Sequence, residues 1–256
     1  SVQDAAPNSS CRVVKMIGSV LWEKHSWIEI KKKLEKGAPV LLPMGCLEEH
    51  GPHLPVGTDL FQAYNVSINV ARRVEGLVLP PFHYGHSSST RNFPGSLVIS
   101  ADTLRSLTRD VITGVIRSGG KFILINTGHA GSTHMSTIKD TLREIAEENP
   151  DVKIFFLTDY EIAEKLAAGD VRFPKNDGHA GDIETSRMMD IKEELVSDPP
   201  KPYFPDFPPH RVLSDPEKYF PEGVMGDPSD ATREKGRYIN EKIEDYLVNL
   251  IEREMD

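Results

Sequence analysis

The sequence has few cysteines, no long apolar run and no dense basic cluster, and each absence excludes a class of protein. Cys11 and Cys46 are the only cysteines among 256 residues, so neither a disulfide framework nor a thiolate zinc site can be assembled from them. No apolar run approaches the length of a membrane span. The densest basic run is 31–33, within an expected helix, and the formal net charge is −9, which argues against nucleic acid as a partner.

The first residues also lack the pattern of a secretion signal. Residues 1–12 are polar and include Asp4, with no apolar stretch flanked by basic residues. We therefore expect a soluble, cytoplasmic protein that acts on a small molecule, without a membrane or nucleic-acid partner. A chain of this length can bury one large core, and we predict a single domain over 1–256.

The sequence does contain a sustained alternation of helical and strand patterns. Apolar residues at helical spacing predict helices at 26–35, 59–73, from 102 to the glycines at 119–120, around 135–145, around 188–189 and at 229–253. Short apolar runs predict strands at 39–44, 77–80, 121–126 and 152–157. This alternation favours a three-layer α/β/α fold with a mainly parallel central sheet.

Two segments carry more specific expectations. The spacing of Leu104, Leu107, Val111 and Val115 predicts one buried face on the helix that begins at 102. Between about 198 and 228, prolines are too frequent for a helix or a central strand, so we predict a long loop there. Its aromatic residues either cover the active site or pack on another subunit.

Residues that can bind a metal follow two of the predicted strands. Glu48, His50 and Asp59 come after 39–44, and His129 comes after 121–126. The carboxyl ends of parallel strands are where ligands gather in such sheets. Alternate residues of an extended segment point the same way, so Glu48 and His50 can share one point while Glu49 faces away.

This donor set indicates the kind of metal. Two carboxylates and two imidazoles without a thiolate suit zinc, manganese or iron(II). We predict one or two divalent ions per subunit, because a carboxylate such as Asp59 can bridge two metals.

A third polar segment, 177–186, leads into the predicted helix around 188–189. Within it, His179 and Glu184 are candidates for proton transfer, and Glu184 is also a candidate metal ligand. Each of these segments alone is a weak signal. Their occurrence at successive strand ends predicts a metal-dependent hydrolase.

Together the segments resemble the creatininase (creatinine amidohydrolase) family over most of the chain. The family's Glu-x-His-Gly-x-His-Leu-Pro motif, with an aspartate eleven residues after the glutamate, matches 48–55 and Asp59. Its other motifs match 93–95 (Phe-Pro-Gly), 128–131 (Gly-His-Ala-Gly), 179–186 (His-Ala-Gly-x-x-Glu-Thr-Ser) and 223–229, the closing segment.

The resemblance implies a homo-oligomer, commonly a hexamer, with a one- or two-metal centre that hydrolyses amide-type bonds. By that analogy Glu48, Asp59 and His129 hold one metal, while His50 and Asp59 hold the other. Gly131 stands where creatininase has a glutamate, so the second site depends on Glu184 for completion.

The function that the resemblance implies is cleavage of an amide-type C–N bond, in a cyclic amide or a formamide, by metal-activated water, with His179 delivering a proton. Creatinine is not the expected substrate. Creatininase closes its pocket with tryptophans, but none follows Trp27 here, and Gly178 replaces the carboxylate before the catalytic histidine, with Asp177 one place earlier. The alternatives are ring opening of a cyclic ketone such as an oxidised inositol, and a catalytically silent member braced by a metal.

Several other polar residues near these motifs have plainer interpretations. We expect His53 to brace its loop, His134 to cap or pack a helix, and Cys46 to form a wall of the site. His83 and His86 either line the pocket or serve packing and surface roles.

Overall fold

The structure is a computed structural model that describes residues 19–167, 174 and 176–255. Its centre is a four-stranded sheet in the order β2, β1, β3, β4, and every pairing is parallel. The strands are β1 (Val40–Met44), β2 (Leu77–Val78), β3 (Phe122–Thr127) and β4 (Lys153–Thr158). Because the strands run the same way, their carboxyl ends reach one edge of the sheet.

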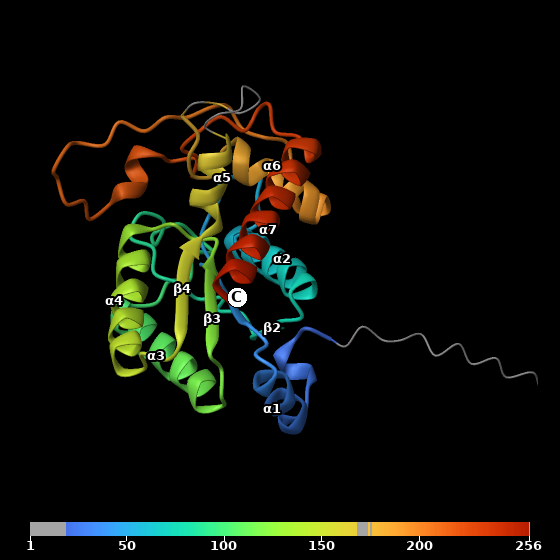
Figure 1. The fold of residues 1–256 in the computed structure, drawn as a ribbon. Coiled ribbons are helices and arrows are strands. Elements are labelled where there is room, and N and C mark those ends of the chain that lie inside the picture. The colour runs from blue at the N-terminus through green and yellow to red at the C-terminus, as the bar shows by residue number, and fades with distance from the viewer. Residues whose placement is uncertain (1–18, 168–173, 175, 256) are drawn as a thin grey trace, which may run out of the picture.

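Seven α-helices are found in the described part of the chain. They are α1 (Trp27–Glu35), α2 (Thr58–Arg73), α3 (Ala101–Arg117), α4 (Ser132–Glu148), α5 (Asp159–Ala167), α6 (Asp182–Lys192) and α7 (Arg233–Met255). α3 and α4 cover one face of the sheet, while α2, α5, α6 and α7 lie on the other side (Figure 1). The predicted three-layer α/β/α fold is therefore confirmed.

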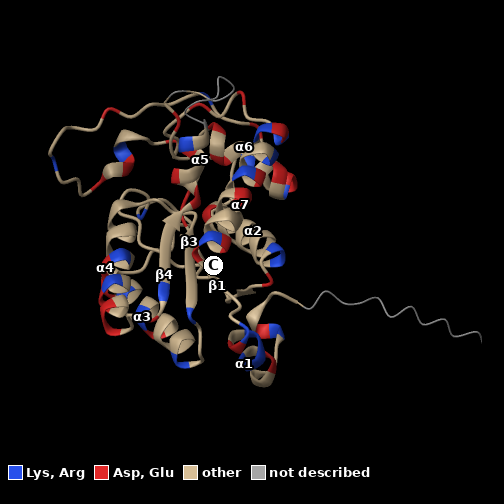
Figure 2. Cartoon of the chain, in the orientation of Figure 1, with Lys and Arg blue, Asp and Glu red and all other residues tan. Residues whose placement is uncertain are grey.

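The alternation of side chains along the strands explains the three layers. In β3, Ile123 and Ile125 pack into the core shared with α3 and α4, whereas Leu124 packs against α2 and α7. Both sets are fully buried, which is why the strands are continuous apolar runs in the sequence. Charged side chains lie mainly on the helices and loops (Figure 2).

Local signals set the ends of the first helix as predicted. The Ser26 hydroxyl accepts a hydrogen bond from the Glu29 amide, and the Glu29 carboxylate accepts one from the Ser26 amide at 2.7 Å, which completes a capping box. After the helix, Gly37 adopts φ +84°, the left-handed conformation that glycine reaches without strain.

The structure differs from the predicted elements in several places, and one is β2, which ends at Val78 rather than at 80. On α3 the buried residues are Leu104, Thr108, Ile112 and Val115, because successive turns at 3.6 residues rotate Leu107 off this line, where it is 37% exposed. α7 begins at Arg233 rather than 229. α5 was not among the predicted helices.

The proline-rich segment is a long loop, as predicted, with one short 3-10 helix at Pro216–Tyr219. Part of it packs on the domain itself: Phe220 is fully buried, and its ring lies 5.4 Å from that of Phe93 and 6.0 Å from that of Phe207. Phe204 remains 57% exposed.

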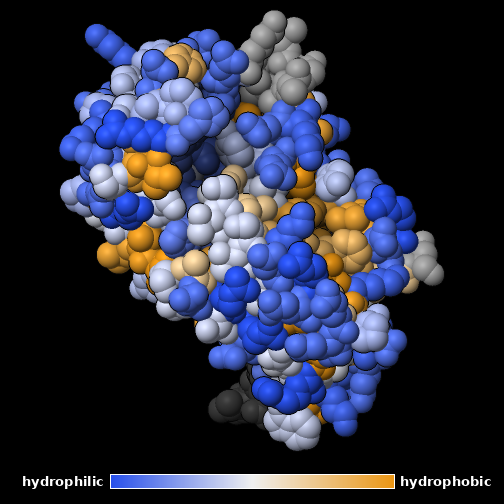
Figure 3. Space-filling model, turned by 90° about the vertical axis from the view of Figure 1, so that its left-hand side faces the viewer, coloured by the Kyte–Doolittle hydropathy of each residue, from blue (hydrophilic) through white to orange (hydrophobic). Residues whose placement is uncertain are grey.

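The outer side of β4 borders a groove of about 660 Å³ against α4. Its apolar lining comes from Met135, Leu142, Ala146, Ile154, Phe156 and Leu157. Figure 3 shows this side of the molecule, where apolar patches interrupt a largely hydrophilic surface.

Within the described residues, no helix is both long and apolar enough to cross a membrane. Two predictions from the sequence stay untested. One is the single domain over 1–256, because residues 1–18 lie outside the described part, and the other is the cytoplasmic location.

Candidate metal centre

Close backbone packing brings the ends of β1 and β3 to the start of α2. A Cβ atom on Gly128 would lie 2.1 Å from the Asp59 carbonyl oxygen, and one on Gly45 would lie 2.6 Å from the Leu60 amide nitrogen. Only glycine permits both approaches. The loop after β3 therefore sits directly on the first turn of α2, and it carries His129 to Asp59.

The four side chains predicted after β1 and β3 meet at one place. His129 Nδ1 lies 2.5 Å from Glu48 Oε1 and 3.4 Å from Asp59 Oδ2. His50 Nε2 lies 3.0 Å from Asp59 Oδ1. Asp59 thus lies between two imidazoles and turns one oxygen towards each, and all four residues are buried.

Glu184 joins this cluster from α6. Its Oε1 atom lies 3.8 Å from His50 Nε2, while its Oε2 atom accepts a hydrogen bond from the Ala180 amide at 2.6 Å. Ala180 has φ +55°, an unusual conformation for alanine that marks the tight turn before the helix.

The donor atoms fit a divalent cation. One ligand atom from each of His50, Asp59 and Glu184 lies within 4.8 Å of the others. The same holds for Glu48 and His129 together with Cys46, and for Glu48, His50 and His179. Donor atoms bound to one ion at about 2.0–2.2 Å lie roughly 3–4 Å apart, so small shifts would seat an ion in one of these groups.

Charge pairing between the imidazoles and the carboxylates shifts the pKa values of this cluster. Burial acts to lower the pKa of His50, but Asp59 and Glu184 outweigh it and raise the pKa to about 10. Burial likewise opposes the charge of His129, yet Glu48 and Asp59 raise its pKa well above the usual value. Burial acts to raise the pKa of Asp59, but the two imidazoles hold it well below its usual range.

Hydrogen bonds to further groups orient three of the candidate ligands. His129 Nε2 donates a hydrogen bond to the His86 carbonyl oxygen at 3.0 Å, which leaves Nδ1 facing the carboxylates. The Thr90 hydroxyl donates to Glu48 Oε2 at 2.5 Å, and His50 Nδ1 donates to the Glu48 carbonyl at 3.2 Å. The sequence analysis did not identify Thr90 or the His86 carbonyl.

His179 lies beside the cluster and has a carboxylate partner of its own. Its Nε2 atom donates to the Glu49 carbonyl at 2.7 Å and lies 3.1 Å from Glu49 Oε1, and its ring centroid is 4.4 Å from that of His50. Burial and His50 act to lower the pKa of His179, but Glu49 and Glu48 raise it overall. Glu49, which is in none of the candidate metal groups of the described residues, pairs with the candidate proton donor.

Two departures from the family pattern have a structural explanation. A Cβ atom on Gly131 would lie 2.4 Å from His129 Nε2, so a side chain there would displace the imidazole. Asp177 accepts hydrogen bonds from the Asp182 and Ile183 amides, at 2.8 Å each, and so caps α6, while Gly178 lines the cavity.

The flanking residues have supporting positions. The Cys46 amide donates to Asp59 Oδ2, and burial, with Glu48, raises the pKa of the Cys46 thiol. His53 Nε2 lies 2.9 Å from the Thr185 hydroxyl oxygen, and burial lowers the pKa of His53 to about 4. Burial lowers the pKa of His134 to about 3, and its ring contacts the Thr127 hydroxyl behind His129.

His83 and His86 do not line the cavity. His83 is exposed. The ring of His86 contacts the Ile99 carbonyl oxygen, 2.9 Å from Nδ1.

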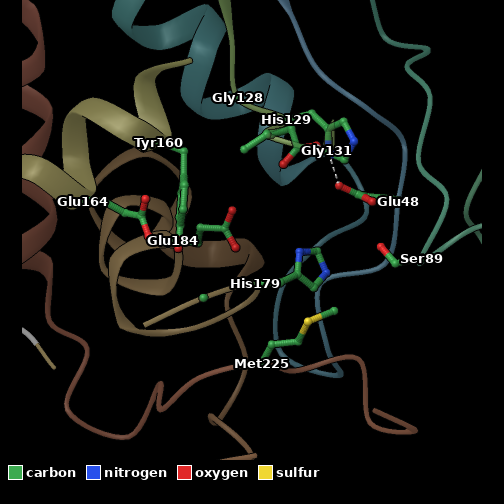
Figure 4. A pocket seen from close by; sticks show the side chains of 13 residues that line it. Glu48, Ser89, Gly128, His129, Gly131, Tyr160, Glu164, His179, Glu184 and Met225 are labelled. Atoms are coloured by element: carbon green, nitrogen blue, oxygen red, sulfur yellow. Dashed lines mark ion pairs between the residues drawn. The ribbon is translucent and has the colours of Figure 1, made fainter. Parts of the chain in front are cut away.

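The cluster opens into a cavity of about 240 Å³ (Figure 4). The lining residues are Glu48, Asp59, Ser89, Gly128, His129, Ala130, Gly131, Tyr160, Glu164, Gly178, His179, Glu184 and Met225. Of the proline-rich loop, Met225 reaches the cavity but none of its five aromatic residues does. The sequence analysis missed Tyr160 and Glu164, although Tyr160 follows the end of β4 by two residues.

Comparisons with known proteins agree with this geometry. A family model described as creatinine amidohydrolase matches residues 23–251. Creatinine amidohydrolase of Pseudomonas putida is 28% identical over 93% of this chain and 98% of its own length. A mycofactocin precursor peptide peptidase of Mycobacterium ulcerans is 30% identical over 84% of each chain, and a 3-dehydro-scyllo-inosose hydrolase of Thermotoga maritima is 23% identical over 91% of this chain and 82% of its own.

Solved structures give the same result. A crystal structure of creatininase superimposes with a TM-score of 0.85 at 26% identity, covering 93% of this chain and 98% of that one. Two other solved creatininases, described as a manganese form and as a Zn-Zn type, have TM-scores of 0.83 and 0.82. With the family model spanning most of the sequence, the chain belongs to the creatininase family and is a metal-dependent hydrolase.

Proposed function

We propose that this chain hydrolyses an amide-type C–N bond, in a cyclic amide or a formamide, in the cavity beside the metal centre. The observation that carries the proposal is the convergence of four candidate ligands and His179 on one cavity, with the fifth ligand, His50, in contact with Asp59 behind it. Glu48, Asp59 and His129 would hold one divalent ion, and His50, Asp59 and Glu184 would hold a second.

The relatives support a hydrolytic reaction, but their names refer to different substrates and so do not identify the substrate of this chain. When bound, divalent ions supply Lewis acidity to a carbonyl oxygen and lower the pKa of a water molecule to about 7, which provides a nucleophile at neutral pH. Hydrolysis then adds the hydroxyl group to the carbonyl carbon and a proton to the departing nitrogen.

The chain's own residues supply the proton and the orientation. His179 holds a proton beside the cavity, because Glu49 stabilises its charged form. Its role in the proposal is to deliver that proton to the leaving nitrogen. Thr90 and the His86 carbonyl hold Glu48 and His129 in place.

A second candidate is hydrolytic ring opening of a cyclic ketone. It is favoured by the relative from Thermotoga maritima, whose name is that of an inosose hydrolase. The same donor set would serve, since a carbonyl is polarised in both reactions, but the bond that breaks is C–C rather than C–N.

The test is metal analysis of protein purified without chelator, followed by a screen of cyclic amides, formamides and cyclic ketones. We expect bound zinc, manganese or iron, and hydrolysis of one amide class that chelation abolishes and added metal restores. A His179→Gln variant should keep its metal and lose turnover by about 10²–10⁴-fold.

The possible outcomes separate the candidates. Cleavage confined to cyclic ketones would replace the proposal with the second candidate. A stoichiometric metal without turnover in any class would favour a metal-braced, silent member. Turnover that survives chelation, or that His179→Gln leaves unchanged, would contradict the proposed roles. A homo-oligomer, commonly a hexamer in this family, stays a prediction that solution scattering can test.

A further inference from the structure

The cavity has a second wall, built by residues outside the metal centre. β4 is another strand whose carboxyl end reaches this edge, and α5 begins directly after it. Tyr160 and Glu164 lie one turn apart on α5, and both line the cavity opposite His179 (Figure 4). Neither belongs to any of the groups that could hold a metal in the described part of the chain.

The hydroxyl group of Tyr160 is buried and has no hydrogen-bond partner among the described residues. Buried hydroxyl groups are nearly always paired, so an unpaired one beside a cavity needs an explanation. Burial and the nearby carboxylates of Glu184 and Asp177 raise the pKa of Tyr160, so the phenol stays neutral. A ligand in the cavity would supply the missing partner.

The charges of the residues that line the cavity indicate whether that ligand is a cation or an anion. Among the described residues, four carboxylates line it, from Glu48, Asp59, Glu164 and Glu184, and no lysine or arginine does. Bound divalent ions would offset three of these charges, because Glu48, Asp59 and Glu184 are candidate ligands. Glu164 forms no ion pair within the described chain, and His179 is already paired with Glu49.

The wall is rigidly held relative to the metal centre. Asp159, adjacent to Tyr160, receives two hydrogen bonds from the Arg187 guanidinium, at 3.2 and 2.9 Å, and both side chains are fully buried. Arg187 lies one turn after Glu184 on α6. The pair therefore fixes the start of α5 against the helix that carries a candidate ligand.

We propose that Glu164 and Tyr160 form a subsite for a protonated primary amine on the substrate. The inference rests on the proposed hydrolysis of an amide. An ammonium group carries three donors and can donate to the Glu164 carboxylate and the Tyr160 oxygen while it contacts the ring. A carboxylate or phosphate at the same position would face uncompensated negative charge.

The first experiment measures binding without turnover. Butylammonium and the neutral isostere 1-butanol are titrated into zinc-loaded protein at pH 7 and followed by ligand-observed NMR. We expect about tenfold tighter binding of the ammonium by the wild type, a difference on the scale of one charge-assisted hydrogen bond.

Variants assign the preference to the subsite. Glu164→Gln should reduce it to within about twofold, and Tyr160→Phe should lower it by a smaller factor. Glu161→Gln is the matched control, because it removes an exposed carboxylate from the same helix that does not line the cavity. Equal binding of the two ligands by the wild type, or equal effects of Glu164→Gln and Glu161→Gln, would overturn the proposal.

The second experiment separates this inference from the proposed function. N-(2-Aminoethyl)formamide and N-propylformamide are isosteric formamides that differ in one ammonium group, and we expect kcat/KM to favour the ammonium compound about tenfold, through KM. Cleavage of neither formamide, with the binding preference intact, would count against formamide hydrolysis and leave the subsite standing. Equal cleavage of both, by wild type and Glu164→Gln, would refute the subsite and support the hydrolase.

Discussion

The ends of β1 and β3 differ from the end of β4 in how their polar side chains are partnered. At β1 and β3, Glu48, Asp59 and both imidazoles contact one another or a neighbouring group. At β4, the Tyr160 hydroxyl is unpaired and Glu164 has no ion-pair partner in the described chain. The first region is organised to hold cations, and the second contains polar groups that no other described residue pairs with.

The comparison also shows two ways of supporting a site. The metal-centre side chains are held by short contacts among the loops after β1 and β3 and the first turns of α2 and α6. The start of α5 is held instead by the buried Arg187–Asp159 pair, with Asn240 accepting from Arg187 Nε at 2.9 Å. Substitutions in the two regions should therefore affect different properties.

Asp59→Ala should have the largest effect, because this carboxylate contacts both imidazoles. We expect bound metal and turnover to fall together, by on the order of 10³-fold or more. Metal content after dialysis and initial rates on the identified substrate measure the two losses. Asp102→Ala, which removes an exposed carboxylate on α3, is the control and should change neither. A full metal complement in Asp59→Ala would show that Asp59 is not a metal ligand.

Arg187→Met should act on stability. Removing the guanidinium leaves the fully buried Asp159 carboxylate unpaired, so the free energy of unfolding should fall by about 3–5 kcal/mol in urea titrations. The control is Arg73→Met, which breaks a half-exposed pair with Asp245 at 2.9 Å and should change stability by about 1 kcal/mol or less. Similar losses of unfolding free energy in both variants would show that burial does not make breaking the Arg187–Asp159 pair more destabilising than breaking an exposed pair.

The smallest expected effect is the change in metal affinity for each unit of pH. The pKa of His50 is raised to about 10 without metal, so an ion that takes this nitrogen must displace a proton. Affinity should therefore rise about tenfold per pH unit for each proton displaced, from neutral pH until the rise levels off near pH 10. Calorimetry in buffers of different ionisation enthalpy counts the protons released.

The metal-free protein supplies the matching stability test. A folded-state pKa above the unfolded value of about 6.5 gives stabilisation that is full below pH 6.5 and is lost as the pH rises through 10. The Tm of the metal-free protein should consequently fall between pH 7 and 10. A pH-independent Tm together with proton-free metal binding would show that His50 is neutral before the ion arrives.

Much of the fold was predictable because local signals agreed with the tertiary arrangement. The capping box at Ser26, the glycine at 37 and the apolar runs of β1, β3 and β4 are read directly from the sequence. Leu107 was misplaced, since its apolar side chain fits a helical stripe whose centre is set by the packing of α3 on the sheet. α5 was missed because it follows β4 without a break.

The candidate metal centre was predictable for a related reason. Its donors stand in dense motifs at the ends of predicted strands, and parallel strands must deliver their ends to one edge. Tyr160 and Glu164 belong to no motif. They could have been predicted only by applying to β4 the rule that ligands gather at the carboxyl ends of parallel strands. The contact of Glu49 with His179 joins residues 130 positions apart, so local spacing could not predict it.

The sequence by itself determined the order of helices and strands apart from α5, the chemistry of the donor set and the edge of the sheet at which it gathers, because periodicity and motif spacing are local properties of the chain. Tertiary structure alone decided which oxygen of Asp59 faces which imidazole, that Gly131 leaves no room for a side chain, and that Tyr160 faces the cavity without a partner. These outcomes depend on contacts between segments whose separation along the chain carries no information about their distance in space.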